Sequence, residues 1–231
     1  MKRSEINQIM LSADAFIRSR GLYLPPFAYW GPQEWQTKGE EAAEIVVNNL
    51  GWDITDFGSG KYQSIGLFIF TVRNGSPDYA RTGQGKSYCE KILIVDVDQV
   101  TPMHFHWSKI EDIINRGGGK LVLQIYNATP DEKLDPSSEV IISTDGVRRR
   151  IPAGGTVELS PGESITLPQR CYHQFWGVGE RVLVGEVSSV NDDDVDNRFH
   201  ARVGRFPEIE EDESPLYLLV KDYPKYYHLA K

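Results

Sequence analysis

Hydrophobic and polar residues alternate in two different ways along this chain. Near the start, apolar residues from Ile6 to Ile17 recur at helical spacing until Gly21 offers a stop, which predicts an amphipathic helix of about four turns. A second helix is expected between Pro32 and Gly51, with Gly39 as a candidate interruption. From Tyr62 onward, short β-rich runs are separated by Gly, Pro, Asn and Asp. These predicted strands are 65–72, 88–97, 120–126, 140–143, 164–167 and 182–187.

The β-rich part predicts an antiparallel sandwich or barrel, because many short strands with turn signals between them are typical of these architectures. At 231 residues the chain is long enough for one well-packed core. We therefore expect a mainly β, single-domain protein over residues 1–231. It comprises an N-terminal helical region (1–61), a barrel (62–190) and a C-terminal extension (191–231) that packs on the barrel.

Composition excludes several classes of partner. The net charge of -8 provides no broad basic surface for a nucleic-acid backbone or an anionic membrane. No apolar run approaches the roughly 20 residues that span a bilayer. The two cysteines are too few for a disulfide framework, and the N-terminus does not read as a secretion signal, so a cytoplasmic location is expected.

The most specific chemical signal is a cluster of histidines. His104 and His106 are one residue apart, so on a strand their side chains point to the same side, and Glu111 can return to that side after a turn. His173 supplies a fourth group downstream. Since the chain has only five histidines, this spacing predicts a metal site with these four ligands.

Three imidazoles and one carboxylate suit Mn²⁺, Fe²⁺, Co²⁺ or Ni²⁺. A six-coordinate ion would keep two open positions, which two neighbouring oxygens of one substrate can fill. Zinc fits this role less well, because four protein ligands close its preferred tetrahedron.

Charged residues near the histidines are candidates for substrate binding and acid–base chemistry. Lys109 lies between two expected ligands and is expected to reach the substrate. Lys91 shares a strand face with Leu93, so it either projects toward the metal or pairs with a carboxylate at the barrel mouth. Glu186 is a candidate inward carboxylate, or alternatively a structural partner of Lys91.

Two further segments are possible parts of a site. The acidic run 208–213 follows a proline-braced loop, which could fold over the barrel mouth and place one carboxylate at the site. Three consecutive glycines at 117–119 lack the context of a phosphate-binding loop, so a turn between strands is expected there.

Two motifs resemble those of the cupin family. The first reads H-x-H-x4-E-x6-G from His104 to Gly118, and the second reads G-x5-P-x-R-x2-H from Gly162 to His173. The chain departs from the family pattern at Asp98 and Arg170, where glycines are usual, and both departures fall at turns rather than at ligands.

The whole chain is similar to the D-lyxose isomerases, a family of sugar isomerases with a cupin barrel. Beyond the metal motifs, the resemblance extends from the N-terminal helix through three further segments, 29–32, 170–173 and 205–212. It implies a Mn²⁺-dependent aldose–ketose isomerase that interconverts D-lyxose and D-xylulose, and often D-mannose and D-fructose. It also implies a free sugar as substrate, and a homodimer. The reaction is expected to run through a metal-chelated enediol, and a metal-assisted hydride shift between the two carbons, which would use the same ligands, stays open.

The resemblance also implies roles for particular residues. The metal ligands would be His104, His106, Glu111 and His173. Lys109 and a carboxylate near 208–211 would be the acid–base groups. Substrate binding is expected from Lys91, Lys109 and Glu111, and the carboxylates considered for the base are Glu208, Glu211 and Glu186.

Three other functions share parts of this signal. A metal-dependent cupin dioxygenase uses the same ligands, but the inward Lys and Glu residues favour a polyhydroxylated substrate. A cupin phosphosugar isomerase needs a cationic cluster, which Arg148, Arg149 and Arg150 could supply. A non-catalytic sugar-binding cupin would not need open coordination positions.

Overall fold

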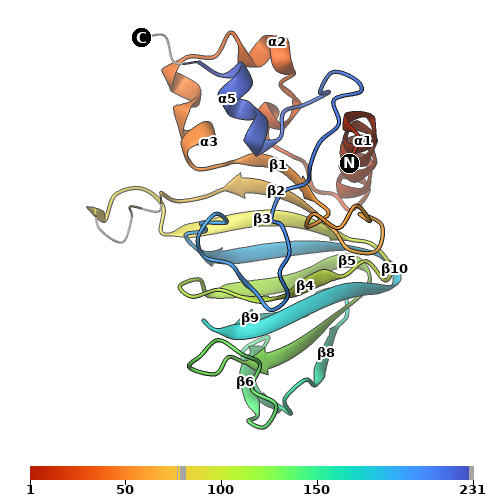
Figure 1. Cartoon of the computed structure of the whole chain (residues 1–231), viewed down its shortest axis with the longest axis vertical. Helices are drawn as coiled ribbons and strands as arrows, with labels where there is room; N and C mark the ends of the chain where they lie inside the picture. Colours follow the sequence, from red (N-terminus) through yellow and green to blue (C-terminus); the bar gives the residue numbers. More distant parts are fainter. Residues whose placement is uncertain (77, 79–81, 229–231) are drawn as a thin grey trace.

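The chain folds around one large antiparallel sheet. The structure is a computed structural model that describes residues 1–76, 78 and 82–228. Eleven strands of the described chain form this sheet, with the order β1-β2-β3-β10-β5-β9-β6-β7. Strand β4 pairs with β10 and β11, and β8 pairs with β5. Helices gather beyond the β1 edge, together with the end of the described chain (Figure 1). The expected mainly β, cupin-like class is confirmed.

The bounds of the elements follow the chain in order. The N-terminal region contains α1 (Arg3–Ser19), η1 (Pro26–Tyr29), α2 (Pro32–Trp35), η2 (Glu40–Ala42) and α3 (Ala43–Val47). The first strands are β1 (Gly51–Thr55), β2 (Leu67–Arg73), β3 (Tyr88–Val95), β4 (Thr101–Phe105) and β5 (Glu111–Asn127). They are followed by β6 (Val140–Thr144), β7 (Val147–Ile151), β8 (Thr156–Leu159), β9 (Ser164–Leu167), β10 (Cys171–Ser189) and β11 (Arg198–Phe199). The chain then forms η3 (Val220–Asp222) and α5 (Tyr223–Tyr226).

Part of the sheet is buried on both faces, and strand alternation decides which residue enters which core. In β2, Leu67 and Ile69 join the barrel core, whereas Phe68 and Phe70 join a second core under α1. Helix α1 closes this outer core with its apolar stripe, which includes Ile6. The barrel core surrounds the cavity described below.

The N-terminal region differs from the sequence expectation. Instead of one helix between Pro32 and Gly51, this stretch holds α2 and, after a break at residues 36–39, η2, which runs directly into α3. Strand β1 already pairs with β2 along its whole length, although it precedes Tyr62, where the sequence placed the start of the barrel. Trp52 is 1% exposed, and its indole donates to the Ala28 carbonyl at 2.6 Å. The pairing of β1 is thus fixed by tertiary contacts rather than by a local pattern.

The three glycines at 117–119 lie inside β5 rather than in a turn between strands. The ladder between β5 and β10 shifts register next to them, and Gly118 has φ +100°. A Cβ at Gly118 would lie 2.0 Å from the Arg181 carbonyl oxygen, so only glycine allows the two strands to approach there.

The C-terminal extension crosses the barrel and returns to the N-terminus. Strand β11 pairs with β4, and a bridge joins Glu210 to Lys2. Beyond it, Leu219 bridges to Trp52 of β1, and α5 packs against α2. Segments far apart in sequence are therefore brought to the barrel mouth.

Candidate metal and active site

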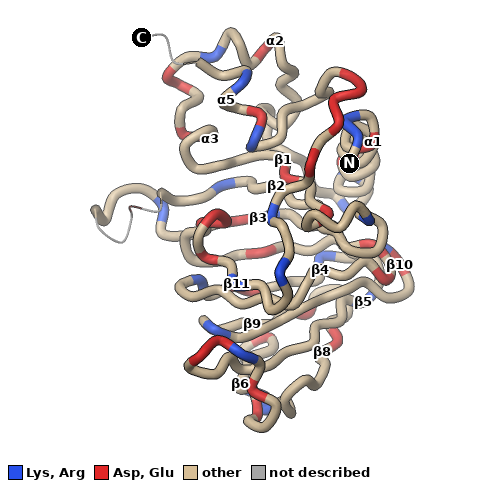
Figure 2. The backbone as a smooth tube through the Cα atoms, viewed as in Figure 1, with Lys and Arg blue, Asp and Glu red and all other residues tan. Residues whose placement is uncertain are grey.

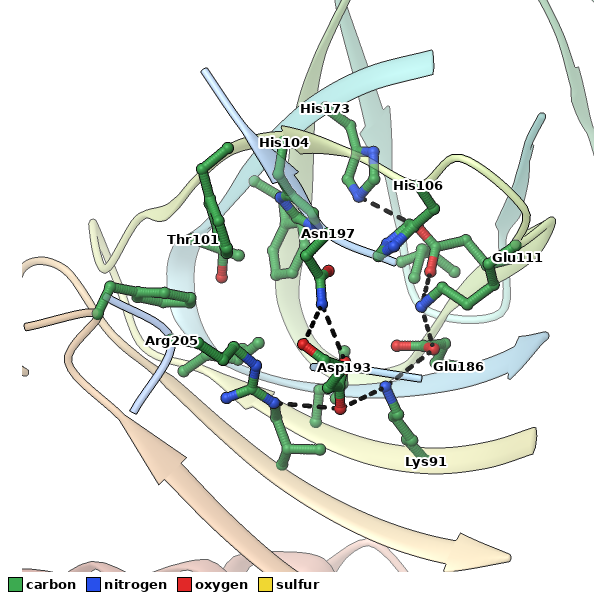
Figure 3. Close-up of a pocket in the computed structure, with 18 residues that line it drawn as sticks. Lys91, Thr101, His104, His106, Glu111, His173, Glu186, Asp193, Asn197 and Arg205 are labelled. Atoms are coloured by element: carbon green, nitrogen blue, oxygen red, sulfur yellow. Dashed lines mark hydrogen bonds and ion pairs between the residues drawn. The ribbon is translucent and has the colours of Figure 1, made fainter. Parts of the chain in front are cut away.

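One cavity in the barrel collects most of the chemically active side chains predicted from the sequence (Figure 3). Its walls come from strands β2 to β5, from β10 and from the C-terminal extension. Predicted site residues that line it are Lys91, His104, His106, Lys109, Glu111, His173 and Glu186. Residues that the sequence analysis did not assign to the site include Thr101, Asp193, Asn197 and Arg205.

The three histidines converge because neighbouring strands carry them. His104 lies on β4 and is paired with His173 on β10, while His106 directly follows β4. All three are buried, and one nitrogen of each lies within 4.8 Å of the others. This is the arrangement that the His-x-His spacing predicted.

Backbone carbonyls fix the tautomer of all three imidazoles. In each ring Nδ1 lies within hydrogen-bond distance of a carbonyl oxygen, which can only accept. Each Nδ1 therefore carries the proton and donates it, and each Nε2 presents a lone pair to the cavity. The acceptors for His104, His106 and His173 are Pro102 (2.7 Å), Asp196 (2.8 Å) and Cys171 (3.0 Å).

Glu111 completes the set of possible ligands. Its Oε1 lies 3.1 Å from His173 Nε2 and 3.6 Å from His106 Nε2, yet it has no hydrogen-bond partner in the part of the chain that the structure describes. A carboxylate oxygen facing two imidazole lone pairs at 3% exposure is unfavourable unless a cation lies between them. Three imidazole nitrogens and one orphaned carboxylate oxygen therefore fit a divalent transition-metal ion.

Electrostatics keep these groups in the protonation states that a metal needs. Burial and the nearby Lys109 ammonium lower the pKa of His106 to about 3, and burial with repulsion from the other histidines holds the pKa of His104 well below its usual value. Burial alone would raise the pKa of Glu111, but Lys109 and His106 outweigh it and hold that pKa well below its ordinary range. At neutral pH His104 and His106 are thus neutral, and Glu111 is ionised.

A chain of alternating charges leads away from Glu111 along one wall of the cavity (Figure 3). The Lys109 ammonium contacts Glu111 at 2.7 Å and Glu186 at 2.9 Å. Lys91 lies 3.5 Å from both Glu186 and Asp193. Burial alone would lower the pKa of both lysines, but the neighbouring carboxylates raise it by more than burial lowers it. Both lysines therefore stay charged. The alternatives for Lys91 are thus combined, since it faces the cavity and pairs with carboxylates there.

Arg205 ends this chain of charges. Its Nη2 donates to Asp53 at 2.6 Å and to Asp193 at 3.1 Å. Burial would raise the pKa of Asp193, but Lys91 and Arg205 hold it well below its usual value. The four carboxylates and three cations of the network leave one negative charge, which a divalent cation beside the histidines would more than offset.

The segment 191–197 positions several of these groups, and sequence reasoning missed it. Asn191 accepts from Lys91 at 2.8 Å and from Lys109 at 3.3 Å. The Asp196 carboxylate accepts from the backbone N–H groups of Ser108 (2.8 Å) and Lys109 (3.0 Å), while its carbonyl holds His106. The signal in the sequence is the polar run that directly follows β10, the strand that carries His173.

The structure does not bring Glu208 and Glu211 to the cavity. Glu208 is exposed, and its backbone carbonyl accepts from the N-terminal amine. Glu211 instead forms a two-pronged ion pair with the fully buried Arg3 guanidinium at 2.8 Å. The acidic run therefore ties the two ends of the chain together, and Glu186 is the predicted carboxylate that lies beside Lys109.

The two departures from the cupin motifs lie at positions with positive φ. Asp98 has φ +58° and Arg170 has φ +59°, in the left-handed region that favours glycine. Arg170 is anchored by a hydrogen bond from Nη2 to the Thr129 carbonyl at 2.9 Å and by the Phe105 ring. The departures thus affect turns and leave the ligands in place.

The arginine triplet that kept a phosphosugar substrate open is remote from the cavity. Arg148, Arg149 and Arg150 lie on the exposed strand β7 at the far edge of the sheet, and none of them lines the cavity. Over the described chain, Lys and Arg are scattered among acidic residues in the view of Figure 2. No helix within that part of the chain is long and apolar enough to cross a membrane.

Solved structures with the same fold include L-ribose isomerases. The enzyme of Cellulomonas parahominis with L-psicose has a TM-score of 0.60 at 17% identity, and covers 91% of this chain and 98% of its own. The enzyme from Acinetobacter sp. DL28 in complex with L-ribose has a TM-score of 0.60 at 15% identity, with the same coverage. At these identities the likeness establishes the fold.

The sequence comparisons are more specific. The D-lyxose/D-mannose isomerase of Serratia proteamaculans is 46% identical over 230 residues, which are 98% of this chain and 99% of that protein. The protein of the same name from Escherichia coli O157:H7 is also 46% identical over 230 residues, 98% of this chain and its own full length. A model of the D-lyxose isomerase family matches residues 1–223. With the predicted motif residues gathered in one cavity and a family match over nearly the whole chain, this protein belongs to the D-lyxose isomerase family.

Proposed function

We propose that this protein is a metal-dependent aldose–ketose isomerase that interconverts D-lyxose and D-xylulose, and also D-mannose and D-fructose. The observation that carries the proposal is the convergence of three proton-fixed imidazoles and Glu111 beside a buried Lys109–Glu186 pair. The names of the relatives at 46% identity support this choice of sugars.

His104, His106, Glu111 and His173 would hold the ion, which we propose to be Mn²⁺, with Co²⁺, Fe²⁺ and Ni²⁺ as substitutes. When bound, such an ion would polarise two adjacent sugar oxygens and stabilise negative charge on them. The Asp196 carbonyl contributes by holding the proton on Nδ1 of His106, which leaves Nε2 free as a ligand.

The isomerisation moves one proton between neighbouring carbons. A base removes the proton from C2 of the open-chain aldose, the electron pair of that bond forms the C1=C2 bond of the enediol, and O1 takes up a proton. The same C2 proton or a solvent proton is then added to C1, and the O2 hydroxyl gives up its proton as the carbonyl forms at C2. Glu186 is suited to this task because it is ionisable, lines the cavity and, unlike Glu111, is not directed at the histidines. Lys109 donates to Glu186 and lines the same cavity, so its ammonium is placed to stabilise negative charge on a sugar oxygen.

Lys91 and Asn191 hold the Lys109 ammonium and the Glu186 carboxylate in place. Lys91 adds a second positive charge at Glu186, since its ammonium lies 3.5 Å from Oε1, the same oxygen that Lys109 contacts. The proposed substrate is a free sugar, since each of the described cations that line the cavity, Lys91, Lys109 and Arg205, is already ion-paired with a carboxylate, which leaves less positive charge to bind a phosphate.

The experiment begins with the metal-free protein. Chelation should abolish conversion of D-lyxose, and Mn²⁺ should restore it. The reaction is then run in D₂O, where proton transfer through an enediol predicts deuterium at C1 of the D-xylulose product. Glu186→Gln should lower turnover by about 10²-fold or more, as for loss of a general base. Glu158→Gln, at an exposed position on β8, serves as the control.

An unlabelled product together with normal turnover of the Glu186→Gln variant would remove the general-base assignment and favour a hydride shift between the two carbons. Activity that survives complete chelation would remove the metal proposal. Preference for mannose 6-phosphate over mannose would indicate a phosphosugar isomerase, and oxygen uptake on substrate addition a dioxygenase.

We also propose that the protein is a homodimer. Tyr23, at 72% exposure, supplies an aromatic side chain that a partner could cover. Of the tyrosines near the other end, Tyr223 and Tyr227 are buried within the chain and Tyr226 is half-buried, so they offer less surface to a partner than Tyr23 does. Sedimentation velocity should show about twice the chain mass of 26.2 kDa, and a monomer at micromolar concentration would contradict the proposal.

A further inference from the structure

Three buried side-chain polar atoms in the described part of the chain have no hydrogen-bond partner, and all three belong to residues that line the same cavity. They are Thr101 Oγ1, Glu111 Oε1 and Arg205 Nη1. A buried polar atom without a partner costs about 1 to 3 kcal/mol, so such atoms are rare in folded proteins. Their concentration at one site indicates that a ligand supplies the missing partners there.

A cation among the histidines accounts for the Glu111 oxygen but not for the other two atoms. In Figure 3 Thr101 and Arg205 lie on one side of the pocket, and Glu111 and Glu186 lie on the other. The unpartnered atoms Oγ1 and Nη1 therefore belong to a wall away from the proposed acid–base pair.

Thr101 is held rigidly at this wall. It begins β4, the strand that also carries His104, and is 2% exposed. Its register partner is Phe175 on β10, so the hydroxyl lies at a point where two strands are already paired. A threonine hydroxyl can both donate and accept hydrogen bonds, as a sugar hydroxyl does.

Contacts of Nη2 and of the guanidinium plane hold the Arg205 side chain in place. Nη2 contacts Asp53 and Asp193, and the guanidinium packs over the Phe206 ring at 4.8 Å. The group remains charged, because its pKa is raised by these carboxylates in spite of burial. Nη1 is thus a positioned donor whose direction is set before any ligand arrives.

We propose that Thr101 Oγ1 and Arg205 Nη1 form a specificity subsite for the sugar hydroxyls remote from the reacting carbons. This inference rests on the proposed function, and it adds which residues select the sugar. With C1 and C2 held beside the histidines, the chain of the sugar extends toward this wall. There Nη1 donates to one hydroxyl oxygen, and Thr101 exchanges a hydrogen bond with a hydroxyl. A sugar lacking the matching hydroxyl leaves a buried polar atom unpaired, which is a strong basis for rejection.

The test uses Thr101→Val, which replaces the hydroxyl by a methyl group of similar size. Because the hydroxyl has no hydrogen-bond partner among the described residues, its removal should leave the melting temperature of the ligand-free protein unchanged or raise it. The KM for D-lyxose should rise about 10-fold, which corresponds to the loss of one hydrogen bond of about 1.4 kcal/mol.

Thr166→Val is the matched control. Thr166 Oγ1 donates to Asp112 at 2.6 Å and does not line the cavity. This variant should therefore show the opposite pattern, with a lower melting temperature and an unchanged KM. A purely structural role of Thr101 would make the two variants behave alike.

A substrate series sharpens the test. Wild-type protein and Thr101→Val are compared on D-lyxose and on its 3-, 4- and 5-deoxy analogues. For at least one analogue, the wild type should lose kcat/KM relative to D-lyxose, whereas the variant should lose little. The reason is that removal of the sugar hydroxyl and removal of the threonine hydroxyl break the same hydrogen bond. Arg205→Lys, which keeps the charge but loses the fork of donors, should raise KM for the same set of sugars.

The outcomes separate this inference from the function on which it rests. An inactive wild-type protein with Mn²⁺ present would overturn the proposed isomerase and the subsite with it. The subsite alone would be overturned if the wild type is active but Thr101→Val keeps the KM for D-lyxose and, on every deoxy analogue, shows the same loss of kcat/KM relative to D-lyxose as the wild type does. A lowered melting temperature of the ligand-free variant would overturn it as well, because it would show that the hydroxyl stabilises the fold.

Discussion

Replacing Lys109 by methionine tests the chemistry and the electrostatics of the cavity together. Methionine keeps much of the length and apolar stem of lysine but removes the ammonium group. In the wild type that group lies 2.7 Å from Glu111 and 2.9 Å from Glu186 at 3% exposure. The variant therefore leaves two buried carboxylates without the cation between them.

The expected magnitudes follow from this geometry. Breaking a buried ion pair by removing one partner costs about 3 to 5 kcal/mol of stability, because a charge is left buried without compensation. Loss of an oriented charge beside a developing oxyanion costs about 10² to 10³ in turnover. Metal occupancy should fall far less, since Lys109 contacts Glu111 but is not itself a ligand.

A double-mutant cycle with Glu186→Gln separates the two effects. Because Glu186→Gln neutralises one of the stranded carboxylates, the double variant should be more stable than the sum of the single losses predicts, by about 1 to 3 kcal/mol. Turnover should not recover, because both groups are assigned to the reaction. Chemical denaturation, initial rates on D-lyxose and metal content by mass spectrometry supply the three readouts.

An exposed lysine provides the control. Lys133 forms an ion pair with Asp131 at 2.7 Å, but both side chains are largely exposed. Lys133→Met should leave both turnover and stability unchanged within error. The reasoning would be refuted if Lys109→Met kept turnover within about threefold of the wild type while binding metal normally, or if its loss of activity merely tracked loss of metal.

The remaining predictions concern other parts of the molecule. Glu211→Gln should keep turnover but lose stability at pH 7. The hydrogen bond from Arg3 lowers the pKa of this carboxyl, so its contribution is present above the ordinary value of about 4.3 and is lost as the pH falls further; thermal melts should therefore show the difference from wild type shrinking at acid pH. Asp196→Asn should weaken Mn²⁺ binding to the metal-free protein about 10-fold, measured by calorimetry, and also lower turnover. The reason is that an amide cannot accept from both backbone N–H groups that hold the loop before Lys109. Burial raises the pKa of both cysteine thiols to about 12, so native protein should not react with iodoacetamide at pH 8, whereas unfolded protein should; rapid native labelling would contradict the buried placement.

The sequence by itself determined the histidine cluster and the class of fold. Strand alternation places His104 and His106 on one side whatever the rest of the chain does, and the same rule placed Lys91 and Glu186 on inward faces. Short-range periodicity also predicted helix α1, because its apolar stripe is complete within the helix itself. These features depend on neighbours only a few residues away.

Other features were decided by the tertiary structure, because they depend on residues far apart in the chain. Strand β1 pairs with β2, and its Trp52 is buried, but no local pattern in the sequence predicts this strand. The acidic run was a reasonable candidate for the site, yet the fold pairs Glu211 with Arg3, 208 positions earlier. Charge alone could not tell which of several acidic segments reaches the cavity.

The polar run after β10 gives the clearest contrast. Nothing in its composition distinguishes Asp193 and Asp196 from solvated acidic residues. Only the return of the extension across the barrel mouth places Asp193 between Lys91 and Arg205, and brings Asp196 under the loop that carries Lys109. Local sequence fixes which way a side chain points from its own strand, but long-range packing decides what it meets there, because that depends on the free energy of the whole fold.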